Sequence, residues 1–204
     1  MASVKEIAQQ RQSIRTYDPT ATLTEEELLS LLNDAITAPS SHNLQPWRFL
    51  VFQTEEARRA LRPIAMNQEH VEKSSAVIAV IGNRKMYEQA STIYDALVES
   101  GQLTKEQKER RVEGIVEYYS SASEETLEKI ATFDTGLVSM QIMLLAKERG
   151  LDTVPMGGFD KKKFHEVYEL KPHEFPAVLI AIGKAAEKPT KTPRLEAEQL
   201  TTFL

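Results

Sequence analysis

Residues 76–82, AVIAVIG, carry no polar side chain and have the length of a β-strand. A strand with one face in water alternates apolar and polar residues, so this run predicts a strand that is covered on both faces. Three further segments read as strands: WRFLVF (47–52), LDTVPM (151–156) and AVLIAIG (177–183). The sequence therefore predicts a buried central sheet.

Helical patterns separate these strands. Thr24 with Glu27, and Thr104 with Gln107, have the spacing of a capping box, and Asp160 is a further N-cap. The predicted helices are SVKEIAQQ (3–10), TEEELLSLLNDAITA (24–38), EEARRALRPI (55–64), two within 84–122, one over 124–149 and DKKKFHEVYEL (160–170). Four or five strands among six or seven helices predict a mixed α+β domain.

The second half of the helix at 124–149 is apolar almost all round. Its sequence, GLVSMQIMLLAKERG (136–150), ends at Gly150, a usual residue just past a helix C-terminus. A helix that is apolar on every face must be covered on every face. We therefore expect a central helix that is partly buried against a second subunit.

Length and composition indicate one globular domain over residues 1–204, with a polar helical excursion at 84–122 and a Pro-broken arm at 184–204. The net charge of -5 argues against nucleic acid and anionic membranes as partners. We expect a cytoplasmic protein, because there is no apolar run of about 18 residues, no signal-peptide pattern and no cysteine.

The common nucleotide and metal motifs are missing. Neither G-x-G-x-x-G nor G-x-x-x-x-G-K-[ST] occurs, and no serine lies in a nucleophile-elbow pattern. The histidines, which lack metal-ligand spacing, are His42, His70, His165 and His173. We predict no metal site.

The segment RQSIRTYDP (11–19) places Arg11, Ser13 and Arg15 at alternate positions. In an extended chain these side chains lie on one side, and two guanidiniums with a hydroxyl form a good phosphate receptor. A solvated polar segment would have the same composition, so both interpretations stay open on these residues alone.

Three loops have compositions that suit ligand binding. APSSHNLQPWRF (38–49) joins a helix to a strand, VPMGGFD (154–160) follows a strand, and TKTPR (190–194) lies in the tail. Gly157 and Gly158 would let a ligand approach the backbone closely. Each loop also has a simpler interpretation: a stiff turn, a strand-to-helix turn or a solvated arm.

Taken together, these motifs resemble the FMN-dependent nitroreductase family. Three motifs occur in that family's order and spacing, over nearly the whole chain: R-x-S-x-R, P-S-S-x-N-x-Q-P-W-x-F and P-x-x-G-F-D. The resemblance implies an α+β sandwich whose central, mostly antiparallel sheet is flanked by helices. It also implies a homodimer with FMN at the subunit interface.

The resemblance also assigns residues to the cofactor. The N-terminal segment would hold the phosphate, ribityl chain and pyrimidine edge, with the tail on the phosphate and Asn67 on the pyrimidine edge. The loop after residue 155 would line the ring, and the partner subunit would add the loop after residue 38. The implied FMN contacts are Arg11, Gln12, Ser13, Arg15, Pro39, Ser40, Ser41, Asn43, Asn67, Met156, Gly157, Gly158, Lys191 and Arg194. The Gly157 N–H would face flavin N5.

Two positions depart from the family pattern, because several members have an acid at Gly157 and a lysine at His70. The activity implied is hydride transfer from NADH or NADPH through FMN to nitroaromatic, quinone or similar acceptors by a ping-pong mechanism, with no catalytic side chain. The alternatives are a dehalogenase, a flavin-fragmenting oxygenase, an azoline-forming dehydrogenase, or a flavin-binding protein without catalysis.

Overall fold

A four-stranded antiparallel sheet forms the centre of the molecule. The computed structural model describes residues 2–204. Its strands are β1 (Trp47–Phe52), β2 (Ala76–Asn83), β3 (Asp152–Met156) and β4 (Glu174–Gly183). They lie in the order β1-β2-β4-β3, and every pair is antiparallel. The expected antiparallel sheet is confirmed.

Strand β2 is buried on both faces, as AVIAVIG predicts. Val77, Ala79 and Ile81 pack into one apolar cluster, and the alternate residues of β2 pack into a second cluster on the opposite face. This arrangement follows from the period-two alternation of side chains along a strand. The sheet therefore has a separate apolar core on each side.

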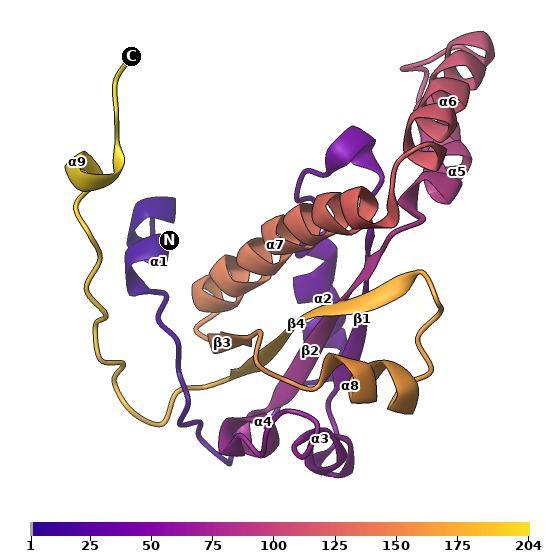
Figure 1. Ribbon diagram of the computed structural model, residues 1–204. Helices are drawn as coiled ribbons and strands as arrows, with labels where there is room; N and C mark the ends of the chain where they lie inside the picture. Colours follow the sequence, from indigo (N-terminus) through magenta and orange to yellow (C-terminus); the bar gives the residue numbers. More distant parts are fainter. Residues whose placement is uncertain (1) are drawn as a thin grey trace.

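Helices cover both faces of the sheet (Figure 1). One side holds α2 (Glu25–Ala35) and the 25-residue α7 (Glu124–Glu148), against which α1 (Val4–Gln10) packs. The other side holds α3 (Glu55–Leu61), α4 (Glu69–Lys73) and α8 (Lys161–Val167). None of the helices within residues 2–204 is both long and apolar enough to span a membrane.

Residues 86–120 form a helical hairpin at one end of α7 (Figure 1). The hairpin contains a 3-10 turn, η2 (Met86–Gln89), then α5 (Ala90–Glu99) and α6 (Lys105–Ser120). Its apolar residues form a third cluster with Leu44 and Leu127. The predicted capping box of Thr104 and Gln107 begins α6, with both hydrogen bonds present.

The C-terminal residues run alongside the N-terminal segment and then leave the body of the molecule (Figure 1). They are mostly exposed and carry a short helix, α9 (Ala197–Leu200). The short helices α9 and α4 were not predicted from the sequence, because four or five residues are too few to show a helical period. The predicted helix at 24–38 also ends earlier, at Ala35, with Ile36 as its C-cap.

An ion pair joins the two strands that flank β2. Arg48 of β1 donates from Nε and Nη2 to the two carboxylate oxygens of Glu174 in β4, at 2.6 and 2.8 Å. Glu174 is buried, and its side chain also accepts a bond from the backbone N–H of Lys171 at 2.9 Å. The hydrogen bonds from Arg48 lower the pKa of the Glu174 carboxyl.

We predict that Arg48→Ala lowers the free energy of unfolding by about 2–4 kcal/mol, because it leaves a buried carboxylate without its partner. Arg59→Ala is the control: exposed Arg59 pairs with exposed Glu55 and lies 3.4 Å from Glu72, which keeps its pair with Arg62, and we expect a loss below about 0.5 kcal/mol. Urea denaturation at pH 7 measures both.

The same pair sets a dependence on pH. The folded-state pKa of Glu174 is lowered, so its contribution is complete above the unfolded value of 4.5 and is lost as the pH falls through the folded value. The difference between wild type and Arg48→Ala should therefore shrink on acidification. A difference at pH 7 no larger than that of Arg59→Ala would contradict this account of the pair.

Candidate functional site

The segment at 11–18 is extended and bonded on two sides. The backbone N–H of Ile14 donates to Thr153 of β3 at 3.1 Å, and the N–H of Asp18 donates to Lys184 after β4 at 2.8 Å. Ile14 and Tyr17 point into the core, and the Tyr17 hydroxyl donates to the carbonyl of Ala181. Ser13 and Arg15 stay exposed.

A cavity of roughly 670 Å³ lies between this segment and the C-terminal tail. Ser13 and Arg15 line one wall, and the tail wall has three cations, Lys188, Lys191 and Arg194, and one acid, Glu187. Gln12 also contacts the tail, because its Oε1 accepts from the backbone N–H of Thr192 at 3.5 Å. The structure thus brings most of the predicted phosphate contacts together; Arg11, the C-cap of α1, lies just outside the lining.

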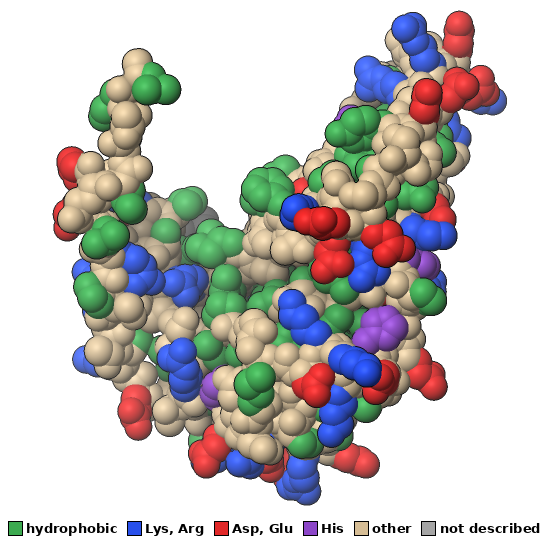
Figure 2. Space-filling model, viewed as in Figure 1, with side chains coloured by type: hydrophobic (Ala, Val, Ile, Leu, Met, Phe, Trp, Pro, Cys, Tyr) green, Lys and Arg blue, Asp and Glu red, His purple; other side chains and the backbone are tan. Residues whose placement is uncertain are grey.

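Positive charge in this cavity is not balanced by ion pairs. Within residues 2–204, no carboxylate lies within 4.0 Å of the charged nitrogens of Arg11, Arg15, Lys191 or Arg194. Arg194 donates only to carbonyls of its own tail. Figure 2 shows Lys and Arg side chains gathered beside the tail. Like charges held close together favour a bound anion.

The end of β3 meets Gln68 and His70, at the start of α4. His70 Nε2 lies 3.0 Å from Met156 Sδ, and Gln68 Nε2 donates to the carbonyl of Gly158 at 3.1 Å. Burial lowers the pKa of His70, and the positive charge of Arg15 lowers it further. A neutral His70 therefore lies near Arg15, beside the loop that was predicted to contact a ring.

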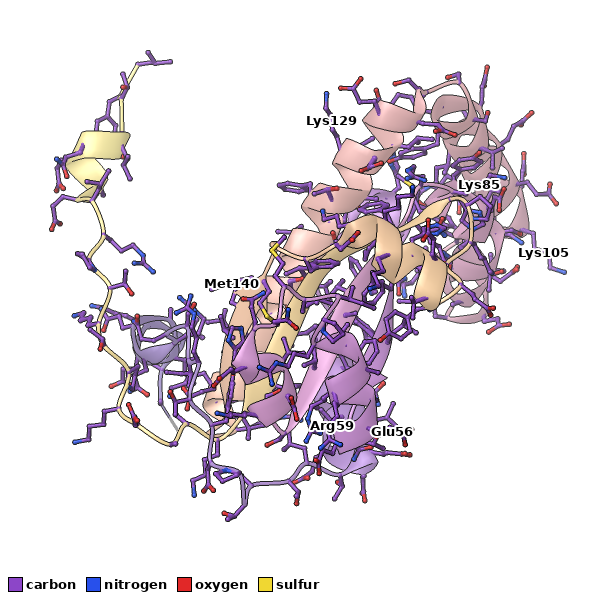
Figure 3. The ribbon with its side chains drawn as sticks, turned by 60° about the horizontal axis from the view of Figure 1, so that its bottom comes forward. Glu56, Arg59, Lys85, Lys105, Lys129 and Met140 are labelled. Atoms are coloured by element: carbon purple, nitrogen blue, oxygen red, sulfur yellow. The ribbon has the colours of Figure 1, made fainter. Side chains whose placement is uncertain are left out.

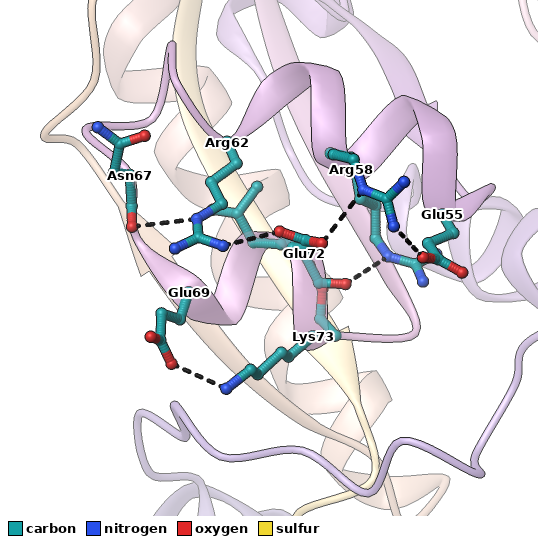
Figure 4. Close-up of polar contacts among 10 residues, drawn as sticks. Glu55, Arg58, Arg62, Asn67, Glu69, Glu72 and Lys73 are labelled. Carbon is teal, nitrogen blue, oxygen red and sulfur yellow. Dashed lines mark hydrogen bonds and ion pairs between the residues drawn. The ribbon is translucent and has the colours of Figure 1, made fainter.

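The side chain of Asn67 is exposed, and its backbone is strained. Its φ of 57° and that of Met66, 54°, lie in the left-handed region. Arg62 holds the Asn67 carbonyl, and Figure 4 shows the side-chain amide pointing away from this contact. A Cβ atom at Gly157 or Gly158 would meet no atom within 4 Å. Asn67 and the two glycines therefore border open space.

The loop at 39–43 lies apart from these groups. Ser41 donates from its backbone N–H and its hydroxyl to Asp134 of α7, at 3.0 and 3.3 Å, and His42 Nδ1 is 2.9 Å from the Tyr119 hydroxyl. Among the described residues, the loop shares neither a hydrogen bond nor a cavity lining with the Arg15 cavity. One chain therefore holds the predicted contacts as two separate groups.

Asp134 was not predicted as a site residue from the sequence, although its position in an apolar helix is a recognisable signal of a specific partner. It is the only acidic residue in ATFDTGLVSMQIMLLA (131–146), which forms the most buried part of α7. Burial raises the pKa of Asp134, although the two bonds from Ser41 lower it. A buried acid on an otherwise apolar helix face indicates a specific partner, here the loop at 39–43.

Backbone strain concentrates in the same two loops. Six non-glycine residues within 2–204 have a positive φ: five are His42, Asn43, Gln45, Met66 and Asn67, and the sixth is Glu169. Strain of this kind costs free energy and tends to gather at functional sites. No group of three metal-ligating side chains lies together in the described part of the chain.

The family model for the nitroreductase family matches residues 8–184. The chain belongs to the nitroreductase family. It is 39% identical over 200 residues to the "Putative NAD(P)H nitroreductase YdgI" of Bacillus subtilis, covering 97% of this chain and 96% of that protein. It is 33% identical to a "CLA biosynthesis enone reductase" of Lactiplantibacillus plantarum, covering 95% and 91%.

A solved structure agrees with this assignment. The crystal structure of a "putative nitroreductase in complex with FMN" from Exiguobacterium sibiricum has a TM-score of 0.95. It is 39% identical, and the alignment covers 100% of this chain and 98% of that one. The nitroreductase fold expected from the sequence is confirmed.

We predict that Asp134→Ala lowers the free energy of unfolding by about 1–3 kcal/mol, because the Ser41 N–H and hydroxyl lose their acceptor. Asp134→Asn should cost less, since its amide can accept from the N–H and donate to the hydroxyl. Thermal denaturation measures both, and equal losses in the two variants would contradict a role for these hydrogen bonds.

Proposed function

We propose that this nitroreductase holds FMN with the phosphate in the Arg15 cavity and uses it as an NAD(P)H-dependent oxidoreductase. The observation that supports the proposal is the set of cations, from both ends of the chain, that face one cavity in an excess over its one acid, Glu187, and form no ion pair within 4.0 Å in residues 2–204. Arginine binds phosphate through forked donors and stays charged at all physiological pH values. The FMN complex of the Exiguobacterium relative supports the same ligand.

Residues beyond the cavity lining would hold the rest of such a ligand. Arg11, Gln12 and Ser13 would bind the phosphate and ribityl chain with Lys191 and Arg194, and Arg15 and Asn67 would bind the pyrimidine edge. Met156, Gly157 and Gly158 would lie along the ring, where no Cβ atom blocks the approach to the backbone. The Gly157 N–H is the donor that we assign to N5.

When bound, FMN supplies hydride transfer from NAD(P)H to an electron-poor acceptor. The donor and the acceptor would bind alternately at the same site. The protein binds and orients these molecules. Arg15 adds positive charge at the pyrimidine edge, and His70 stays neutral because of its burial and the nearby Arg15. We assign no side chain as a general acid, so the protons of the product come from water.

The acceptors that we propose are nitroaromatics and quinones. An enone is a second candidate, since the Lactiplantibacillus relative is named an enone reductase. Both classes accept a hydride at an electron-poor centre and need no side-chain nucleophile. A screen of nitroaromatics, quinones and enones under steady-state conditions with NADH and with NADPH separates them. Anaerobic NADPH should bleach the flavin absorbance, which a flavin-binding protein without catalysis would not do.

We further propose a homodimer in which the 39–43 loop completes the partner's site. Helix α7 exposes an apolar stripe: Phe133 is 67% exposed, Met140 is 40% exposed (Figure 3), and a Cβ atom at Gly136 between them would meet nothing. The arm also exposes Leu195, Leu200 and Phe203. A second copy would bury these residues, and Pro39, Ser40, Ser41 and Asn43 would then contact the FMN of the other subunit.

We predict that Arg194→Gln raises the Kd for FMN by about 10- to 100-fold, the effect of one charge-assisted bond. Binding of riboflavin, which has no phosphate, should change less than twofold. Lys162→Gln, on the exposed surface of α8, is the matched control. Fluorescence titration of apoprotein measures all three. Equal losses for FMN and riboflavin would contradict the placement of the phosphate.

The dimer gives a separate prediction. Met140→Asp should convert a dimer into a monomer that retains less FMN, because a charge on the α7 stripe would have to be buried. Val167→Asp, at an exposed apolar residue of α8, should leave the mass unchanged. Light scattering after gel filtration gives the masses. A monomeric wild type with full FMN occupancy would overturn the proposal.

A further inference from the structure

A groove of roughly 800 Å³ lies where the 39–43 loop meets helix α6. On α6 its lining includes Arg110, Arg111, Gly114 and Tyr118, which recur at the three- and four-residue spacing of one helix face. His42 closes the groove from the loop. The groove is thus built from the hairpin and from the loop that we propose to reach a partner's FMN.

Two arginines of this groove have no acidic partner. Within residues 2–204, no carboxylate lies within 4.0 Å of the guanidinium nitrogens of Arg110 or Arg111, although α6 carries four glutamates. By contrast, Lys108 of the same helix pairs with Asp95 of α5 at 2.6 Å. Two adjacent forked donors suit a carboxylate or a phosphate.

The wall beside the arginines is aromatic and packs on a buried ring. Tyr118 is 61% exposed and meets Tyr119 edge to face, with ring centroids 5.0 Å apart. Tyr119 is buried, stacks on Tyr87 and holds His42 through its hydroxyl. An exposed ring on a buried, hydrogen-bonded support offers a flat surface on which a planar molecule can stack.

Gly114 leaves space in the middle of the groove. It lies inside α6, where glycine is the least favourable residue after proline, and its backbone is an ordinary helix. A Cβ atom there would meet nothing within 4 Å, so packing inside the chain does not require a glycine. The missing side chain leaves room for a ligand between Tyr118 and the arginines.

We propose that this groove selects substrates that join a planar, electron-poor or aromatic group to an anionic group. The ring would lie over Gly114 beside Tyr118, and the anion would bind Arg110 and Arg111. This inference rests on the proposed function, because His42 belongs to the loop assigned to the partner's flavin. The anion has two possible sources: the carboxylate of an acceptor, or the 2′-phosphate of NADPH.

The test compares wild type with Arg110→Gln/Arg111→Gln, using 4-nitrobenzoate and its neutral analogue 4-nitrobenzamide as acceptors, and NADPH and NADH as donors. We expect KM to rise at least about tenfold for 4-nitrobenzoate or for NADPH, and less than twofold for 4-nitrobenzamide and NADH. Whichever anionic substrate is affected identifies the source. The charge-matched control is Lys105→Gln/Lys129→Gln, which removes two exposed lysines outside the groove lining (Figure 3).

Equilibrium binding gives a second readout. Calorimetric titration of the oxidised holoprotein with 4-nitrobenzoate, and with NADP+ in place of NADPH because NADP+ does not reduce the flavin, should show the same loss of affinity for the affected anion. Gly114→Leu should keep the protein folded and raise KM for both nitro compounds, because it fills the groove. If no KM or affinity changes more than twofold while the flavin stays bound and NADPH still bleaches it, the groove proposal is wrong and the proposed function stands. Loss of flavin binding in the wild type would instead refute the proposed function.

Discussion

Uncompensated positive charge is the constraint on which the site depends. Arg15 and Ser13 are placed by a strand-like segment bonded to β3, and Lys191 and Arg194 lie on the tail that faces it. In a chain of net charge -5, acidic partners would be easy to supply, yet none lies within 4.0 Å of these cations in residues 2–204. Cations held together without ion pairs raise the free energy of the protein without ligand, and in the proposed complex the FMN phosphate at Lys191 and Arg194 and the pyrimidine edge at Arg15 would lower it.

The pyrimidine edge of the proposed ligand would meet less positive charge than its phosphate. Where several family members have a lysine, this chain has His70, which is buried against Met156 and lies near Arg15. Burial and the charge of Arg15 both oppose protonation of His70, so in the proposed complex Arg15 would be the main positive charge at the pyrimidine edge. A neutral imidazole can still donate or accept one hydrogen bond. The position would therefore contribute through hydrogen bonding rather than through charge.

Local patterns were readable in the sequence, and distant pairings were not. AVIAVIG gave a strand buried on two faces, and Thr104 with Gln107 gave the start of α6, because each signal lies within a few residues. The bond from Ser41 to Asp134 spans 93 positions, and that from His42 to Tyr119 spans 77. No periodicity encodes such pairs. The cofactor residues came from a family resemblance, and the cavity that brings Ser13, Arg15, Lys191 and Arg194 together came only from the fold.

The two strained loops explain why the proposed site should need two chains. Asp134 of α7 and Tyr119 of α6 hold Ser41 and His42 within the loop's own subunit, and the N–H groups of Asn43 and Gln45, which have a positive φ, bond to Ser40 of the same loop. The loop is therefore shaped before any partner binds. In the proposed dimer the loop presents a preformed surface to the other subunit's flavin, so little conformational entropy is lost on assembly. Flavin binding and dimer formation would then stabilise each other, because each completes a surface that the other needs.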